Sequence, residues 1–230
     1  LKGSIVAFPI SNPLGMQWGE YVSPHDYVNM YVAYPGSKDG SITSRLANFI
    51  WENASRTADL VMDLHENVKP CLHFSFVGYS DNKKIEARAL ELAKAFGLTI
   101  IRPKGEFALA GMKPGDVEYI DVCMSHGVPA FTPELEAGTD LTLDEKWTSV
   151  RVGVRGLMNV LKKLEMIPGA VEPQTEAMVF QGNFAFHGMA IANRGGLVNR
   201  LVDVGVKLKK GTPIAKVLNA YGEEVETIEM

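Results

Sequence analysis

The chain alternates short apolar segments with amphipathic ones over its first 168 residues, and this alternation limits its fold more than any other feature. The apolar segments have strand length and are expected at 4–10, 59–64, 72–77, 98–101 and 128–132. Segments with helical periodicity are expected at 42–50, 81–96, 116–125 and 143–164. This alternation predicts an α/β sheet that is covered by helices on both faces.

Two segments of this region carry more specific expectations. Residues 11–40 contain many Pro, Gly, Asn, Ser and Tyr residues with little periodicity, so they predict a long ordered loop of the kind that often has a function. The helix over 143–164 is expected to bury a stripe of large apolar residues. This stripe consists of Trp147, Val150, Val154, Leu157, Leu161 and Leu164.

The character of the sequence changes after Pro168-Gly169. Residues 170–230 contain recurrent glycines between short Val, Ile and Leu segments, and they lack a convincing helical pattern. We therefore expect an α/β domain over 1–168 and a small all-β domain over 172–230. The stretch VDVGVKLKKGTPIAKV resembles the barrel-sandwich hairpins of biotinyl and lipoyl modules. The Met-Lys-Met or Asp-Lys-Ala triplet that carries their cofactor does not occur, so a covalently attached cofactor is not expected.

Composition excludes several classes of partner. The formal net charge is −4, and no window is dense enough in Lys and Arg to bind nucleic acid through its phosphates. No apolar run approaches the roughly 18 residues that a membrane-spanning helix needs. The two cysteines form neither a disulfide framework nor a metal-binding pair. A cytoplasmic protein fits these features.

One histidine stands at a notable place, in the stretch VMDLHE over residues 61–66. His65 follows a predicted strand, and residues 132–138 (TPELEAG) follow another. Sites in α/β sheets collect at the carboxyl ends of strands. Zinc accepts imidazole nitrogen and carboxylate oxygen, and it lowers the pKa of water to about 7, so the pattern indicates zinc-assisted hydrolysis. The alternative is a structural histidine where the strand reaches the surface. Asp63, two residues earlier, faces the same side and could orient the ring.

Four motifs, in order along the chain, carry a resemblance to a known family. They are LKGSIVAFPISNPLGM, SPHDYVNMYVAYPGSKDGSITSRLA, ADLVMDLHE and SHGVPAFTPELEAG. Together with the β-rich tail they resemble the succinylglutamate desuccinylase/aspartoacylase family of the zinc carboxypeptidase superfamily. The resemblance implies a three-layer α/β/α carboxypeptidase-like domain followed by a barrel-sandwich-like β domain. It also implies a deacylase that cleaves a small N-acyl amino acid or a related amide.

The resemblance assigns roles to particular residues. The family binds one catalytic zinc through a His-x-x-Glu pair and the histidine of Asp-Leu-His, and this last role falls on His65. The glutamate of Thr-x-Glu-Leu is the general base, and an ungapped frame from Gly127 places it on Glu134. Glu136, in a Glu-x-Gly pattern, is the rival position. Members often form dimers or tetramers, so a homo-oligomer is expected.

The sequence departs from the family pattern in two places. No histidine has a glutamate three residues on, so we expect the remaining metal ligands to precede Leu1 or the zinc to be lost. Tyr31-Val32 stands where the family has Asn-Arg, and no arginine occurs before Arg45. Tyr31 or His25 could substitute as a donor to the substrate. The alternative function is that of a non-catalytic relative that binds a ligand or partner in the same cleft.

Overall fold

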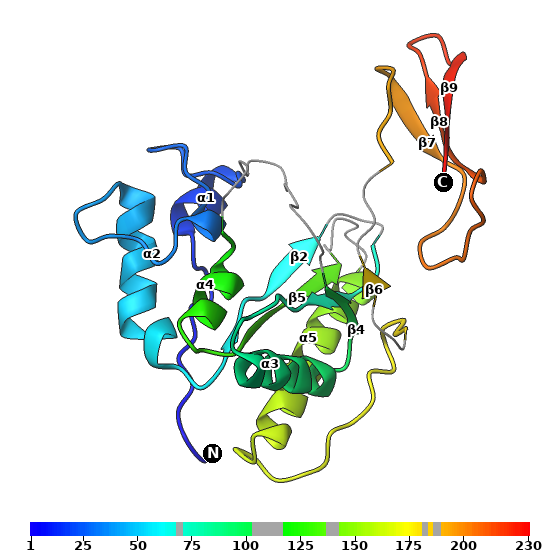
Figure 1. Ribbon diagram of the computed structural model, residues 1–230. Helices are drawn as coiled ribbons and strands as arrows, with labels where there is room; N and C mark the ends of the chain where they lie inside the picture. The colour runs from blue at the N-terminus through cyan, green and yellow to red at the C-terminus, as the bar shows by residue number, and fades with distance from the viewer. Residues whose placement is uncertain (68–70, 103–116, 137–142, 181–183, 186–189) are drawn as a thin grey trace.

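A mixed sheet with helices packed on it forms the larger part of the molecule (Figure 1). The computed structural model describes residues 1–67, 71–102, 117–136, 143–180, 184–185 and 190–230. The strands of this sheet are β1 (Val61–Met62), β2 (His65–Asn67), β3 (Phe74–Phe76), β4 (Thr99–Arg102), β5 (Ala130–Glu136) and β6 (Phe184–Ala185). Their order is β1-β5-β3-β4-β6, and β2 also pairs with β5.

Strand β5 organises this sheet because three other strands pair with it. Both β1 and β2 run parallel to β5, whereas β3 is antiparallel to it. Strand β4 pairs with β3 on one side and with β6 on the other, and both pairs are parallel. The predicted α/β sheet is confirmed. Its strand β5 extends four residues beyond the predicted 128–132, although Pro133 lies within it.

The helices of the described residues are α1 (Pro13–Trp18), α2 (Ile42–Asn53), α3 (Lys83–Phe96), α4 (Tyr119–Ser125) and α5 (Leu143–Lys163), with two short 3-10 turns, η1 (Met30–Val32) and η2 (Ser55–Thr57). Four of these helices, α2 to α5, fall in the ranges that the periodicity predicted, and α1 was not predicted. Helix α3 begins at an Asn82 cap and ends at Gly97, whose φ of 97° is left-handed. Helices α3 and α5 pack against each other and against β5, and α4 also contacts β5.

The buried face of α5 contains Val152, Val160 and two glycines, and the predicted apolar stripe lies only partly on it: Leu157 and Leu164 pack against the core, half-buried. A Cβ on Gly153 would come within 3.1 Å of Leu135 on β5, and one on Gly156 would overlap the ring of Phe96 on α3. This close approach turns Val150 and Val154 outward, where they are 48% and 54% exposed. The prediction that these two valines are buried was wrong. The Trp147 side chain lies outside the described residues.

The expected strand at 4–10 does not form. These residues are extended, and no backbone hydrogen bond joins residues 3–11 to another described residue. Ile5 and Val6 remain 55% and 63% exposed. An apolar run becomes a strand only when a neighbouring strand pairs with it, and none of the described strands lies along this segment.

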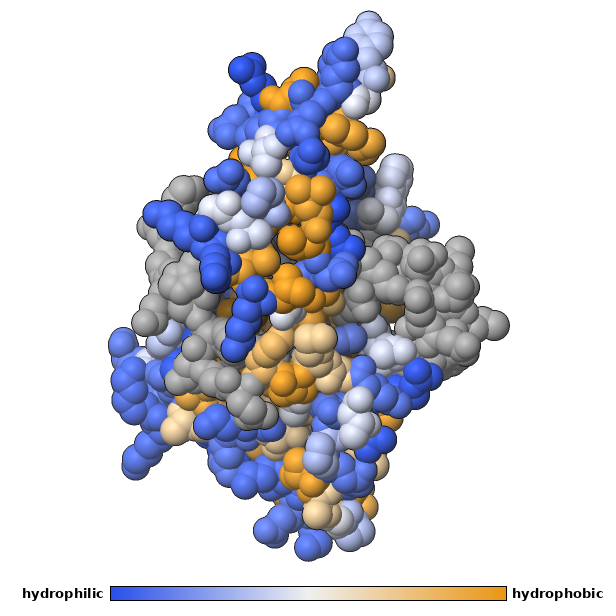
Figure 2. All heavy atoms as spheres, turned by 90° about the vertical axis from the view of Figure 1, so that its right-hand side faces the viewer, coloured by the Kyte–Doolittle hydropathy of each residue, from blue (hydrophilic) through white to orange (hydrophobic). Residues whose placement is uncertain are grey.

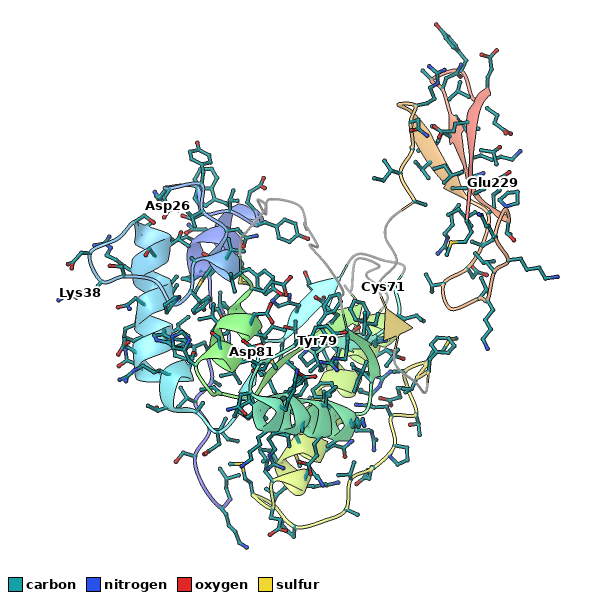
Figure 3. All side chains as sticks on the ribbon, viewed as in Figure 1. Asp26, Lys38, Cys71, Tyr79, Asp81 and Glu229 are labelled. Atoms are coloured by element: carbon teal, nitrogen blue, oxygen red, sulfur yellow. The ribbon has the colours of Figure 1, made fainter. Side chains whose placement is uncertain are left out.

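The loop over 11–40 is ordered, and it contains α1 and η1. Asp26 lies near the N-terminal end of α2 (Figure 3). Its carboxylate accepts hydrogen bonds from the Thr43 backbone N–H at 2.9 Å and from the Thr43 hydroxyl at 2.8 Å. Burial opposes ionisation of Asp26, but hydrogen bonds from Ser41, Thr43 and Val28 outweigh it and hold the pKa well below its usual value. These contacts fix the loop to α2 and thereby fix η1.

A separate antiparallel sheet forms the C-terminal part. Its strands are β7 (Leu197–Arg200), β8 (Pro213–Leu218) and β9 (Glu224–Glu229). Figure 2 shows hydrophobic residues along the face of the molecule below this sheet. In the C-terminal part itself, Ile191 and the β7 residues Leu197 and Val198 are exposed. Strand β6, although it lies beyond residue 172, pairs with β4 of the larger sheet. Within the described residues, no helix has the length and apolar character to cross a membrane.

The contact between α5 and α3 gives a stability prediction. Gly156→Ala should lower the free energy of unfolding by about 1–2 kcal/mol, because the overlap with Phe96 outweighs the better helix propensity of alanine. Gly195→Ala is the matched control, since its new Cβ would meet no atom within 4 Å. Urea unfolding of both variants measures the difference. Equal stability of the two variants would contradict this packing of α5.

Candidate functional site

The register between β2 and β5 brings together the residues on which the sequence analysis concentrated. His65 pairs directly with Glu134 in the parallel ladder. Residues paired in a ladder point to the same face of a sheet, and alternate residues of one strand point to opposite faces. Phe131 and Leu135 on β5 face α3 and α5. Glu134 therefore faces the other side of the sheet, together with His65.

The imidazole of His65 lies between two carboxylates. Its Nε2 is 3.0 Å from Asp63 Oδ2, and its Nδ1 is 3.4 Å from Glu134 Oε1. The side chain of His65 is 29% exposed, whereas that of Glu134 is only 7% exposed. The predicted orientation of Asp63 on the same side as His65 is therefore what the structure shows.

These surroundings control the charge of the imidazole. Burial lowers the pKa of His65, but the hydrogen bonds and charges of Asp63 and Glu134 outweigh burial and raise the pKa to about 10. A metal ion takes the unprotonated form of a ring nitrogen. His65 therefore has to release a proton before it can act as a ligand.

Tyr31 completes the described part of the site. Its ring meets that of His65 edge to face, with ring centroids 5.0 Å apart. Its hydroxyl donates a hydrogen bond to Glu118 Oε2 at 2.6 Å. Burial and the neighbouring Glu118 carboxylate raise the pKa of Tyr31, so its hydroxyl stays protonated and able to donate. Burial also raises the pKa of Glu118, while the bond from Tyr31 acts in the opposite direction.

A cleft of about 1570 Å³ contains this group of residues. Tyr31, Asp63, His65 and Glu134 all line it. The cleft is also lined by most of residues 2–12, by residues from the end of α2 to β1, and by apolar side chains near the end of α5. His25 is not among the lining residues and is exposed, so of the two predicted substitute donors only Tyr31 has access to the cleft.

The described residues fit one part of a zinc site. His65 offers an imidazole nitrogen, and a carboxylate on its other nitrogen is the usual way in which a metal-binding histidine is oriented. No group of three His, Cys, Asp or Glu within the described ranges is arranged to hold a metal ion. The described part of the chain could thus supply one metal ligand and the carboxylate that orients it, and a zinc site would need further ligands.

Sequence reasoning placed His65, Asp63, Glu134 and Tyr31 at this site, and the structure brings all four together. The side chain of Glu136, the rival position for the base, lies outside the described residues. Glu118 was missed. It lies 87 positions from Tyr31, and no local pattern marks it; only a charged residue directly before an apolar helix could have drawn attention to it.

An α/β sheet with an imidazole and a carboxylate in a cleft defines a class of domain rather than one family. A comparison with known protein families identifies the family to which this domain belongs. The model of the succinylglutamate desuccinylase/aspartoacylase catalytic domain matches residues 1–161. The chain therefore belongs to the succinylglutamate desuccinylase/aspartoacylase family, as the sequence motifs predicted.

Individual proteins are similar to this chain in sequence or in fold. The N-alpha-acetyl-L-2,4-diaminobutyric acid deacetylase of Halomonas elongata is 23% identical over 231 residues, which is 100% of this chain and 65% of that protein. The product-bound ectoine utilization protein EutE (DoeB) from Ruegeria pomeroyi aligns with a TM-score of 0.75 and 22% identity, over 95% of this chain and 64% of that one.

A succinylglutamate desuccinylase/aspartoacylase from Rhodobacter sphaeroides has a similar fold. It gives a TM-score of 0.74 at 21% identity, over 95% of this chain and 64% of that chain. The present chain therefore spans about 64–65% of the length of these relatives.

The bond between Tyr31 and Glu118 gives a prediction about stability. Tyr31→Phe should lower the free energy of unfolding by about 1–2 kcal/mol, because the half-buried Glu118 loses its hydrogen-bond donor. Tyr27→Phe is the control, since Tyr27 is 80% exposed. Denaturant unfolding compares the two variants. Equal stabilities would show that this bond contributes nothing to the fold.

Proposed function

We propose that the chain belongs to a zinc-dependent deacylase that cleaves a small N-acyl amino acid. The observation that carries this proposal is the Glu134 carboxylate 3.4 Å from the His65 imidazole, in a cleft that both residues line. Membership of the family supports it. So does the Halomonas elongata relative, which by its name removes an acetyl group from an amino acid with a second amine.

His65 would be one ligand of the zinc, and Asp63 would hold its ring. When bound, zinc would polarise the amide carbonyl and favour loss of a proton from water. Asp63 accepts a hydrogen bond from Nε2, which fixes the tautomer, so Nδ1, which lies 3.4 Å from Glu134 Oε1, would be the nitrogen offered to the metal. The other ligands have to come from outside the described residues.

Glu134 is the proposed general base and acid. A buried carboxylate at the edge of the cleft can take a proton from an attacking water and pass it to the leaving nitrogen. Its low exposure keeps bulk water from competing for this proton. We propose Glu134 rather than Glu136 because the register sets Glu134 opposite His65, whereas Glu136 pairs with Asn67.

The alternative is a non-catalytic relative that binds a ligand or partner in the same cleft. Two observations favour it. The sequence has no arginine before Arg45 to stabilise a developing oxyanion, and the described residues do not complete a metal site. The cytoplasmic location, the homo-oligomer and the barrel-sandwich form of the C-terminal sheet stay predictions.

Metal analysis separates the two functions. The complete protein should contain about one zinc per chain, and His65→Ala should lose most of it, because one nitrogen ligand in a site of three is removed. Elemental analysis after dialysis measures this ratio. If the complete protein lacks stoichiometric zinc, the enzyme proposal fails and the binding alternative gains support.

The role of Glu134 is tested by an isosteric change. Glu134→Gln should lower kcat by about 10²–10⁴-fold, because the amide cannot take up a proton, while the fold and the zinc content remain. Glu52→Gln is the control, since Glu52 forms an exposed ion pair with Arg56 outside the cleft. Full activity in Glu134→Gln would assign the base to another residue, with Glu136 the first to examine.

A further inference from the structure

The hydroxyl of Tyr31 already donates its hydrogen to Glu118, which limits the hydrogen bonds that it can form with a substrate. Its single hydrogen goes to Glu118 Oε2 at 2.6 Å. A tyrosine hydroxyl has one hydrogen and two acceptor lone pairs, so only acceptor capacity remains. Tyr31 lines the cleft beside His65. A substrate group that meets Tyr31 therefore finds a hydrogen-bond acceptor backed by a carboxylate.

The position of Tyr31 is fixed from two sides. Its backbone N–H donates to the Asn29 side chain at 3.0 Å, which begins η1. Glu118, immediately before α4, holds the other end of the side chain through the hydroxyl. A group held by the backbone of one element and by a side chain from another loses little freedom when a ligand binds. The pair of Tyr31 and Glu118 is thus preorganised.

The side chains that line the cleft carry a net negative charge, as does Glu118. Within the described residues, five lining side chains are carboxylates and three are cations. The carboxylates are Glu20, Asp59, Asp63, Glu66 and Glu134, and the cations are Lys2, Arg88 and the His65 imidazolium, which pairs with Asp63 and Glu134. Arg88 is already paired with Glu91 at 2.7 Å. A second carboxylate on a substrate would meet repulsion here, whereas an ammonium group would be attracted.

We infer that Tyr31 and Glu118 form a specificity-determining pair that selects N-acyl substrates whose side chain carries an ammonium group. This inference rests on the proposed function and deepens it. The ammonium N–H groups donate to the Tyr31 hydroxyl oxygen, and the charge of Glu118 stabilises them. Glu118 acts through Tyr31 and is a positioning residue, since it does not itself line the cleft.

Three N-acetylated amino acids of matched size provide the test. They are Nα-acetyl-L-2,4-diaminobutyrate, N-acetyl-L-norvaline and N-acetyl-L-aspartate, with a cationic, a neutral and an anionic side chain. The complete protein should hydrolyse the first with a kcat/KM at least about tenfold above that for the second. The aspartate derivative should be the poorest. A preference for the aspartate derivative would overturn the inference.

Glu118→Gln and Tyr31→Phe then test the pair itself. Each should lower the ratio of kcat/KM for the cationic over the neutral substrate by about tenfold, mainly through KM, while hydrolysis of the norvaline derivative changes less. Glu52→Gln, which removes the same charge outside the cleft, should leave the ratio unchanged. If Glu118→Gln lowers all three rates equally, its role is structural and the inference is wrong.

A binding measurement separates this inference from the proposed function. If none of the three compounds is hydrolysed, the deacylase proposal fails, and calorimetry with free L-2,4-diaminobutyrate and L-norvaline tests the pair without turnover. The native protein should bind the diamine about tenfold more tightly, and Glu118→Gln should remove that difference. Equal affinity for both amino acids in the native protein would overturn the inference.

Discussion

The direct pairing of His65 with Glu134 is the constraint on which the rest of the site depends. The two residues are 69 positions apart, and only the register of β2 on β5 sets their side chains on the same face of the sheet. A slip of one residue would turn His65 away from Glu134 and toward the side that α3 and α5 cover. The glycines of α5 support this arrangement, because they let the helix lie close to Leu135 and Phe96. Packing on one face thereby positions the polar groups on the other.

A second set of contacts brings Tyr31 to the same place. Asp26 fixes the loop over 11–40 to the start of α2, and Glu118 fixes the Tyr31 hydroxyl. The site thus collects side chains from a loop, two strands and the start of a helix. Each of these side chains is held by contacts with another residue of the site. A small shift of any one of these elements would change the surroundings of the His65 imidazole, which contacts Asp63, Glu134 and Tyr31.

Much of the fold follows from local sequence rules. The period of two along VMDLHE placed Asp63 and His65 on one side, and Gly97 closed α3 where a left-handed residue was needed. The errors have physical causes. The run over 4–10 has strand composition, but pairing depends on a neighbour that composition does not reveal. The stripe of α5 was misplaced because periodicity weighs large apolar residues, whereas Gly153 and Gly156 define the closest contact. Glu118 was missed because its partner is distant in sequence.

The central claim is that His65 binds a divalent ion beside the carboxylate of Glu134. A crystal structure of the complete protein with zinc, with anomalous diffraction recorded at the zinc absorption edge, tests it most directly. The expected result is one anomalous peak about 2.0–2.1 Å from a ring nitrogen of His65, with Glu134 close enough to share a water with the metal. A peak at another site, with the His65 ring still held only by Asp63 and Glu134, would contradict it.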